Sequence, residues 1–518
     1  MSVIIQGHGG QDNNVKIDFK EDFSVTTNLL GPNSKGIDEI SSNIHEINHY
    51  PPQNFEPYLS NFADFLFNDH ERNNNILLGN GASELIDLAI RNVDGDTWRP
   101  SYSAIQFMEY ERSTESNGKK KVSWNDKRSN LICLINPNNP TGDYKDINQL
   151  KSYIVEMTDP NVKTHVIVDE SMQIWHGPEW RSDSLVSQTE WIRTMAEKNV
   201  YVYIIHSWTK IFSCTGIRYG SIVCPTKDIY ERLRSRQVPW SVNILALKYI
   251  DACIKDRDYL DKTWNLTKET RAYQVKELKI MFPTWLIKGH DFLSWIWIDT
   301  HDSDIAELCY NLAKFNGTPI RHGKMGYKMD THIRIAVRDR VHFESLLKAL
   351  EPVSRIVSSK QRFNDDRVIK TIHLDIDPKI IHSFEWIDVN RLGSHEHYIQ
   401  DRHSKFLEYL KEVGDMVCIP AIIVCKDSMM TIDGHHRKSI IKALGYEKAP
   451  CLLIDYSNDN IVVNLDKDIS KDSVMSCTED NLLEPKSTAH IVRDNNGVYH
   501  PLQVLSPIVK LKQLNEIN

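Results

Sequence analysis

A lysine flanked by hydroxyl groups is the clearest chemical signal in the chain. Lys210 lies in the stretch Ser207–Gly220 (SWTKIFSCTGIRYG), after the apolar run Val200–Ile205, and Arg218 follows eight residues later. A lysine amine at the end of a strand can form a Schiff base with a carbonyl compound, and neighbouring hydroxyls with an arginine can hold a phosphate. By itself the pattern also fits a solvated lysine, so the elements that position it decide the interpretation.

Short apolar runs end at further polar groups. They are typical of buried strands: Leu131–Ile135, Val166–Val168 and Val200–Ile205. The first ends in the Asn-rich turn 136–142 (NPNNPTG), the second at Asp169 and the third at the Lys210 stretch. Alternation of such strands with helical segments predicts a mostly parallel sheet covered by helices, and ligands gather at the carboxyl ends of its strands. We therefore expect these polar groups to share one site.

A small-residue turn precedes an earlier helix. Ile76–Leu78 leads into Gly79–Glu84 (GNGASE), and the residues from Leu85 to Ile90 continue as a helix. Free backbone N–H groups at a helix start favour a bound phosphate. The same residues also fit a plain strand-to-helix turn that Ser83 caps.

The motifs together resemble those of fold-type-I pyridoxal-phosphate enzymes of the aminotransferase class I/II superfamily. In chain order they read HGG, DFSVTTNLLGP, GNGASE, NPNNPTG, VDE, SWTKxFxxxGIRYG and IRHG…HIRIAVR. The nearest branches in this resemblance are histidinol-phosphate aminotransferase and the threonine-phosphate decarboxylase of cobalamin synthesis. It implies an α/β domain over residues 1–355, with a mostly parallel sheet and a smaller α+β part.

The resemblance also implies the contacts of the cofactor, pyridoxal 5'-phosphate. Lys210 would bind it covalently, Asp169 would keep its ring nitrogen protonated, and Asn139 would donate to its ring hydroxyl. A carboxylate beside that nitrogen raises the nitrogen's pKa through its opposite charge. Tyr102 would stack on the ring, and the cofactor phosphate would be held by Ala82, Ser83, Thr209, Arg218 and, from a second subunit, Tyr50.

On the substrate side, the resemblance assigns Arg334 to a carboxylate, and Arg321 with His8 to a substrate phosphate. A single arginine read alone is more often part of a surface ion pair. The sequence departs from the family at Met172, where a tyrosine or phenylalanine is usual three residues after the aspartate. That departure removes a hydroxyl near the ring and weakens the case for ordinary transamination, without deciding between decarboxylation and transamination.

A polar, charged stretch over 356–367 predicts a linker to a second domain, residues 368–518. There we expect a short strand at Thr371–Ile376, a helix at Arg402–Val413, and paired strands at 421–424 and 430–432. Asp433–Arg437 (DGHHR) then opens the helix Lys438–Leu444. Such a junction combines backbone N–H groups with an arginine and suits a nucleotide phosphate, although it also fits a capped helix with two polar histidines.

This second domain resembles the α+β ParB/sulfiredoxin superfamily, in particular its free-serine-kinase branch. The supporting motifs are SHEH at 394–397, TIDGHHR at 431–437, PCLLIDY at 450–456 and PKSTAH at 485–490. The resemblance implies that Glu396 is the general base and that Asp433 and His436 surround the transferred phosphoryl group. Arg437 and Lys486 would neutralise charge, with ATP or ADP as donor and Mg²⁺ bridging phosphates. Sulfiredoxin chemistry is excluded because His435 stands where it needs a cysteine.

Composition adds few constraints. The net charge of −8 gives no reason to expect nucleic acid as a partner, and no run is long enough to cross a membrane. Nine cysteines without metal-ligand spacing favour reduced thiols in the cytoplasm. The family pattern implies a homodimer.

The two domains suggest each other's substrates: a kinase that phosphorylates L-serine, or L-threonine, and a decarboxylase that gives phosphoethanolamine or aminopropanol phosphate. The alternatives are a transaminase acting on a phosphorylated amino acid or histidinol phosphate, and a nucleotide-binding regulator.

Overall fold

The computed structural model describes residues 19–67, 75–101, 105–358, 368–370, 374–413, 418–463 and 469–510. The chain divides into two compact units. Among the described residues, Asp22–His301 and Ile320–Phe343 belong to the first unit, and Asp302–Pro319 with the residues from Glu344 onward belong to the second. The predicted linker over 356–367 lies mostly outside the described residues, so that boundary stays a prediction.

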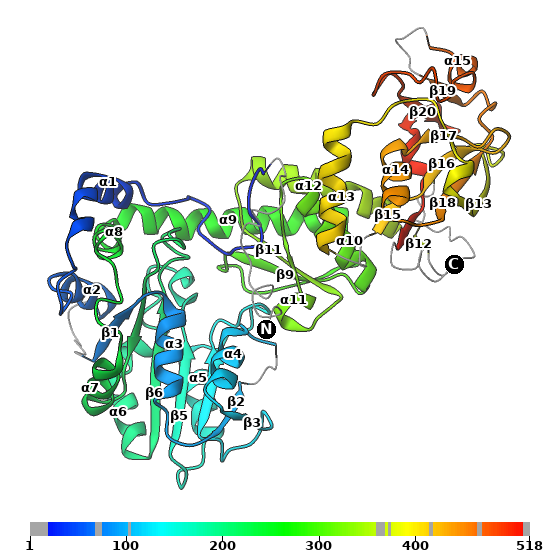
Figure 1. The fold of residues 1–518 in the computed structure, drawn as a ribbon. Helices are drawn as coiled ribbons and strands as arrows, with labels where there is room; N and C mark the ends of the chain where they lie inside the picture. Colours follow the sequence, from blue (N-terminus) through cyan, green and yellow to red (C-terminus); the bar gives the residue numbers. More distant parts are fainter. Residues whose placement is uncertain are drawn as a thin grey trace. The chain divides into compact units, whose positions relative to one another are not determined.

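A seven-stranded sheet organises the first unit (Figure 1). Its order is β1-β7-β6-β5-β4-β2-β3, in which β7 runs antiparallel to both neighbours and the pairs from β6 to β3 are parallel. The strands are β1 Ile76–Gly79, β2 Thr97–Pro100, β3 Lys120–Lys121, β4 Leu131–Ile135, β5 Thr164–Asp169, β6 Val200–Ser207 and β7 Gly220–Val223. The mostly parallel sheet expected from the apolar runs is confirmed.

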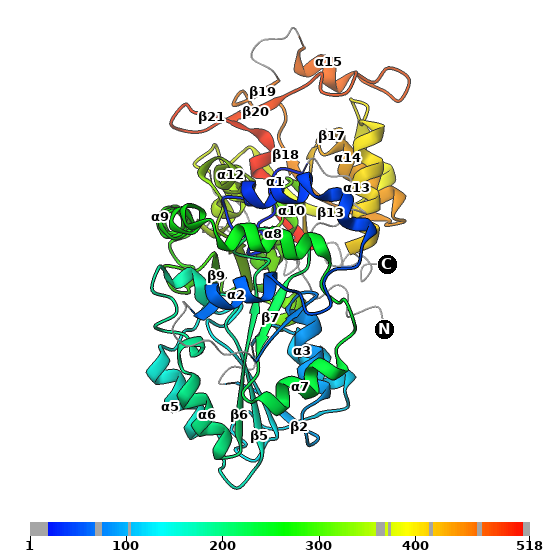
Figure 2. The ribbon, with the colours of Figure 1, turned by 90° about the vertical axis from the view of Figure 1, so that its left-hand side faces the viewer.

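Alternation along the central strands feeds two hydrophobic cores. In β5, Val166 and Val168 enter one core, whereas Ile167 enters the other, because successive side chains point to opposite faces. Figure 2 shows α5 and α6 on one side of the strands and α3 and α7 on the other. The helices of the first unit are α1 Ser34–Ser42, α2 Tyr58–Phe67, α3 Ala82–Arg91, α4 Glu109–Ser116, α5 Ile147–Glu156, α6 Thr189–Glu197, α7 Lys227–Arg236, α8 Ile244–Ile254, α9 Arg257–Met281 and α11 Lys324–Tyr327.

A smaller antiparallel sheet follows in the same unit, in the order β10-β11-β9-β8. Its strands are β8 Leu286–Lys288, β9 Trp295–Asp299, β10 Arg321–His322 and β11 His332–Ala336. The register sets Arg321 opposite Arg334, and Arg334 opposite Trp297. Directly opposed residues share a face of a sheet, so these three side chains form one row.

The second unit is an α+β region. A five-stranded sheet runs β13-β18-β16-β17-β14, with three-stranded sheets β12-β22-β15 and β19-β20-β21. The strands are β12 Val368–Lys370, β13 Ile381–Asp388, β14 Gly393–Ser394, β15 Cys418–Pro420, β16 Ile422–Cys425, β17 Met430–Asp433, β18 Lys448–Ile454, β19 Ile461–Val463, β20 His490–Arg493, β21 Tyr499–Pro501 and β22 Ile508–Lys510. The helices are α10 Ser303–Phe315, most of α12 Arg340–Ser358, α13 Gln400–Val413, α14 His435–Ala443 and α15 Lys471–Met475.

The strand expected at Thr371–Ile376 is wrong where it can be checked. Residues 374–376 form no strand, and the Ile376 N–H instead donates to the Leu374 carbonyl at 2.9 Å. Both side chains still pack on the core of the second unit, so their alternation reflects a turn over an apolar surface. The hairpin of β16 and β17 is confirmed. Within the described residues, no helix combines the length and apolarity needed to cross a membrane.

Candidate active site

Lys210 follows the end of β6 among hydroxyl groups. Its Nζ lies 3.2 Å from Ser207 Oγ and 3.5 Å from Thr209 Oγ1. Burial and, less strongly, the positive charges of Arg218 and Arg334 lower the pKa of Lys210 to about 8, while Asp169 acts in the opposite direction. A lysine with this pKa supplies a sizeable fraction of neutral amine near physiological pH, and the neutral form is the nucleophile.

Asp169 ends β5 and is almost fully buried. Its Oδ1 accepts from the Ser171 N–H and its Oδ2 from the Tyr110 hydroxyl, both at 2.9 Å. Burial and the neighbouring Asp169 raise the pKa of Tyr110 well above its ordinary value, so Tyr110 remains a donor. Tyr110 was not predicted from the sequence. Its one local signal is an aromatic residue in the otherwise polar helix EYERSTES of α4.

The start of α3 faces Arg218. Gly81 is the N-cap with φ +78°, and no side chain caps the helix, so the alternative in which Ser83 is the cap is wrong. A Cβ built on Gly81 would lie 2.2 Å from Arg218 Nη2, and one on Gly220 would lie 2.5 Å from the Ala82 nitrogen. Helix N–H groups and a guanidinium thus meet at a turn that only glycine allows, and this arrangement suits a phosphate.

Arg334, on β11, is bound to the turn that follows β4. Its Nη1 donates to Asn139 Oδ1 at 2.6 Å and to the Tyr327 hydroxyl at 3.2 Å, and its Nη2 donates to the Ser24 carbonyl at 2.7 Å. Because Asn139 Oδ1 accepts from Arg334, the Asn139 amide nitrogen is left to donate elsewhere. Tyr327 is a second residue that the sequence did not reveal.

Arg321 is nearly fully buried beside Arg334, and its Nη2 donates to the Met325 carbonyl at 2.7 Å. Met172 lies in the hydrophobic core of the first unit, consistent with a position that presents no hydroxyl to the site. Tyr50 is 78% exposed, with its ring centroid 4.6 Å from that of Trp240. The predicted site residues His8 and Tyr102 lie outside the described residues.

The Aminotransferase class I and II family matches residues 34–350. The chain belongs to this family. It is 23% identical over 344 residues to histidinol-phosphate aminotransferase 1 of Idiomarina loihiensis, which covers 62% of this chain and 87% of that protein.

The fold is shared with solved structures of other proteins. The histidinol-phosphate aminotransferase from Clostridium acetobutylicum matches with a TM-score of 0.55 and 23% identity, over 65% of this chain and 99% of that one. The L-threonine-O-3-phosphate decarboxylase from Porphyromonas gingivalis matches with a TM-score of 0.53 and 18% identity, over 64% and 98%. The first unit therefore has the fold-type-I architecture with a large mixed sheet.

Pyridoxal 5'-phosphate fits the side chains of this site. Lys210 offers an amine of lowered pKa, and Asp169 a buried carboxylate at the end of the neighbouring strand. The uncapped start of α3 and Arg218 match the cofactor phosphate. Asn139 completes the set with its amide nitrogen. These four features come from separate elements, so their meeting is a property of the fold.

In the second unit, Glu396 holds the loop 486–488. Its Oε1 accepts from the Lys486 N–H at 2.8 Å, and its Oε2 accepts from the Thr488 N–H at 3.1 Å and hydroxyl at 2.9 Å. Lys486 adopts φ +66°, a left-handed conformation that costs a non-glycine residue free energy. The three bonds fix the direction of the carboxylate that the sequence proposes as a base.

The DGHHR motif forms the junction between β17 and α14. Arg437 is ion-paired with Asp433, and its Nη1 donates to the carbonyls of Pro420 at 2.9 Å and Ala421 at 2.6 Å. These contacts use most of the hydrogen-bond donors of the Arg437 guanidinium, which was expected to neutralise phosphate charge. His436 Nε2 accepts from the Ile399 N–H at 2.9 Å. The start of α14 has no side-chain cap.

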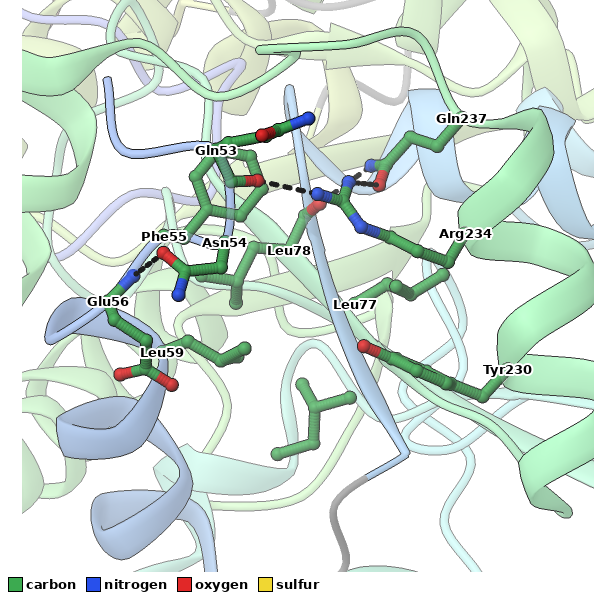
Figure 3. A pocket seen from close by; sticks show the side chains of 11 residues that line it. Gln53, Asn54, Phe55, Glu56, Leu59, Leu77, Leu78, Tyr230, Arg234 and Gln237 are labelled. Atoms are coloured by element: carbon green, nitrogen blue, oxygen red, sulfur yellow. Dashed lines mark hydrogen bonds between the residues drawn. The ribbon is translucent and has the colours of Figure 1, made fainter.

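A cavity of about 670 Å³ lies along the edge strand β1, apart from all of these residues (Figure 3). Arg234 spans it, donating from Nη2 to the Gln53 carbonyl at 2.6 Å and from Nη1 to Gln237 Oε1 at 3.1 Å. The cavity contains none of the predicted site residues. Across the described ranges, no cluster of three His, Cys, Asp or Glu side chains is arranged to hold a metal ion.

Proposed function

We propose that the protein is a bifunctional enzyme: a decarboxylase of O-phospho-L-serine, with O-phospho-L-threonine as the close variant, and a kinase that makes this substrate from the free amino acid. The observation that carries the first half is the pair of opposed arginines, Arg321 and Arg334, beside Lys210. Two buried guanidinium groups on one sheet face match a substrate with two anionic groups. The match to a threonine-phosphate decarboxylase fold is compatible with this choice.

In the first half, each residue has a separate task. Arg334 holds the substrate carboxylate and Arg321 its phosphate, which orients the α-carbon toward Lys210. Asp169 keeps a positive charge on the ring nitrogen, and Lys210 Nζ takes up and returns protons. When bound, pyridoxal 5'-phosphate supplies the electron sink for the breaking bond. The bond between the α-carbon and the carboxylate breaks, CO₂ leaves, and a proton takes its place.

In the second half, the proposal assigns a phosphoryl transfer to the junction of β17 and α14. The serine hydroxyl attacks the terminal phosphorus of ATP or ADP, Glu396 accepts the hydroxyl proton, and the shortened nucleotide leaves. Mg²⁺ would supply positive charge to the nucleotide phosphates, and His436 and Asp433 would border the transferred group. The three hydrogen bonds that orient Glu396 and the uncapped start of α14 support this assignment. Arg437 would act mainly by bracing the motif.

A transaminase is the second candidate, favoured by the match to histidinol-phosphate aminotransferases. It would need an acceptor such as 2-oxoglutarate and would release no CO₂ from a phosphorylated amino acid. The two candidates differ in whether the α-carbon of the substrate loses its hydrogen or its carboxylate.

Two substitutions test the halves separately. Lys210→Ala is expected to abolish CO₂ release from phosphoserine while phosphorylation of serine continues. Glu396→Ala is expected to stop phosphorylation while supplied phosphoserine is still decarboxylated. Phosphorus NMR and trapped CO₂ measure the two reactions in one sample. Full decarboxylation by the Lys210 variant, or full phosphorylation by the Glu396 variant, would remove the corresponding assignment.

The proposal includes a homodimer. Tyr50 and Trp240 form an exposed aromatic pair, and Ile47 and Val238 near them in sequence are also exposed. Burial of such side chains against a second copy would lower the free energy of the assembly. Light scattering is expected to give twice the chain mass, and Trp240→Asp to shift the protein toward monomer. A monomeric wild-type protein would contradict the dimer.

A further inference from the structure

Tyr327 is held at the end of a sharply turned segment. Gly326 has φ +87° and Lys328 φ +58°, so left-handed residues flank it on both sides. Arg321 Nη2 fixes the segment by donating to the Met325 carbonyl at 2.7 Å. Tyr327 is only 8% exposed. Glycine adopts a positive φ freely, but Lys328 does so at a cost, so the surrounding structure must hold the backbone next to the buried tyrosine in place.

The Tyr327 ring lies over the row of side chains on the small sheet. Its centroid is 5.8 Å from that of Trp297, in an edge-to-face arrangement, and 5.7 Å from the Arg321 guanidinium. Its hydroxyl contacts Arg334, the third member of the row. The aromatic ring therefore lies beside both buried arginines, and it reduces the repulsion expected for like charges directly opposed in a sheet.

The hydroxyl of Tyr327 makes long hydrogen bonds. It lies 3.2 Å from Arg334 Nη1 and 3.3 Å from Asn139 Oδ1, whereas Arg334 and Asn139 are only 2.6 Å apart. N–H···O and O–H···O bonds are strongest at shorter distances than these, so the two tyrosine bonds contribute little. A carboxylate arriving at Arg334 offers the hydroxyl a charged and stronger acceptor.

We propose that Tyr327 is a specificity-determining residue. When the substrate binds, the Tyr327 hydroxyl donates to a carboxylate oxygen that Arg334 also binds, instead of to Asn139. Arg321, beside the tyrosine ring, binds the substrate phosphate. The site then prefers phosphate monoesters that carry a carboxylate over those with a neutral group in its place. This inference rests on the substrate assignment of Arg321 and Arg334 in the proposed function.

The test compares two ligands that lack an amine and so do not react: 3-phosphoglycerate, and glycerol 3-phosphate with a hydroxymethyl group in place of the carboxylate. Binding to the cofactor-loaded full chain is measured by calorimetry. Tyr327→Phe is expected to weaken 3-phosphoglycerate binding about 10- to 100-fold, the range for a lost hydrogen bond to a charged group. Glycerol 3-phosphate binding is expected to change less than about threefold, because no carboxylate oxygen is involved.

Tyr201→Phe is the matched control. Tyr201 lies near the opposite end of β6 from Lys210, and among the described residues its hydroxyl makes no hydrogen bond. Both variants should keep the cofactor absorbance and melting temperature of the wild type. Equal losses for the two ligands in Tyr327→Phe, or no loss for either, would overturn the inference alone. Failure of the wild type to bind either ligand would overturn the substrate assignment and the inference together.

Discussion

The amine of Lys210 provides a quantitative test of the site through pH. With the pKa of Lys210 near 8, about one tenth of the amine is neutral at pH 7, against less than about one part in a thousand for a lysine of ordinary pKa. Only the neutral amine attacks an aldehyde, so its reactivity must rise with pH and level off once pH exceeds the pKa. Burial is the main cause of the shift, and the charges of Arg218 and Arg334 add to it.

The assay mixes cofactor-free protein with pyridoxal 5'-phosphate for a short time at pH values from 6 to 11, and borohydride makes the new carbon–nitrogen bond permanent. Peptide mass spectrometry then gives the labelling rate at each lysine. We expect half-maximal labelling of Lys210 near pH 8 and a plateau above about pH 9.

Lys268 serves as the internal control. Its Nζ lies 2.9 Å from Asp291 Oδ2 on the surface, and that contact raises the pKa of Lys268 above its ordinary value. Its labelling should still increase at pH 10, where Lys210 has reached its plateau. Parallel pH profiles for the two lysines would refute the argument that the burial of Lys210 prepares its amine.

Three substitutions test other parts of the structure. Tyr110→Phe removes a donor to buried Asp169 and should lower the free energy of unfolding of the cofactor-free protein by about 1.5–3 kcal/mol, seen as a melting temperature several degrees lower. Tyr203→Phe, which loses a hydroxyl contact to neutral His165, should cost less, and the reverse order would contradict the role of Tyr110. Gly81→Ala places a Cβ against Arg218 and should weaken cofactor binding at least about tenfold. Gly118→Ala, also at positive φ but with open space around it, should leave cofactor affinity unchanged. Equal effects of the two substitutions in a fluorescence titration with the cofactor would argue against the phosphate site. Arg437→Met breaks an ion pair and two hydrogen bonds to carbonyls, and should lower the free energy of unfolding of the second unit by about 1–3 kcal/mol. Lys405→Met breaks an exposed ion pair of the same sequence spacing and should lower it by less than about 1 kcal/mol. Similar losses in thermal unfolding would show that Arg437 contributes little to holding the motif.

Much of the first unit could be predicted from the sequence because its signals are local. The apolar runs mark β4, β5 and β6, and in a parallel sheet their carboxyl ends must meet, which brings Asp169 and the Lys210 stretch together. Arg218 follows from the same motif. The meeting of these side chains could therefore be predicted from residue order, whereas their roles toward the cofactor came from the family resemblance.

The remaining residues depend on contacts that no local pattern encodes. Tyr110 is 59 positions from Asp169 in the chain, and Tyr327 is 188 positions from Asn139. A tyrosine on a short polar helix or in a kinked turn gives no sign of a distant partner. The strand expected at Thr371–Ile376 failed for a related reason, because alternating apolar residues can also reach a core from a turn.

The most direct test of the account supplies O-phospho-L-serine to the cofactor-loaded protein without any keto acid and measures released CO₂ together with the phosphorus NMR spectrum. The account predicts CO₂ and phosphoethanolamine in equal amounts. Turnover that begins only when 2-oxoglutarate is added, with a phosphorylated keto acid and no CO₂, would contradict it and identify a transaminase.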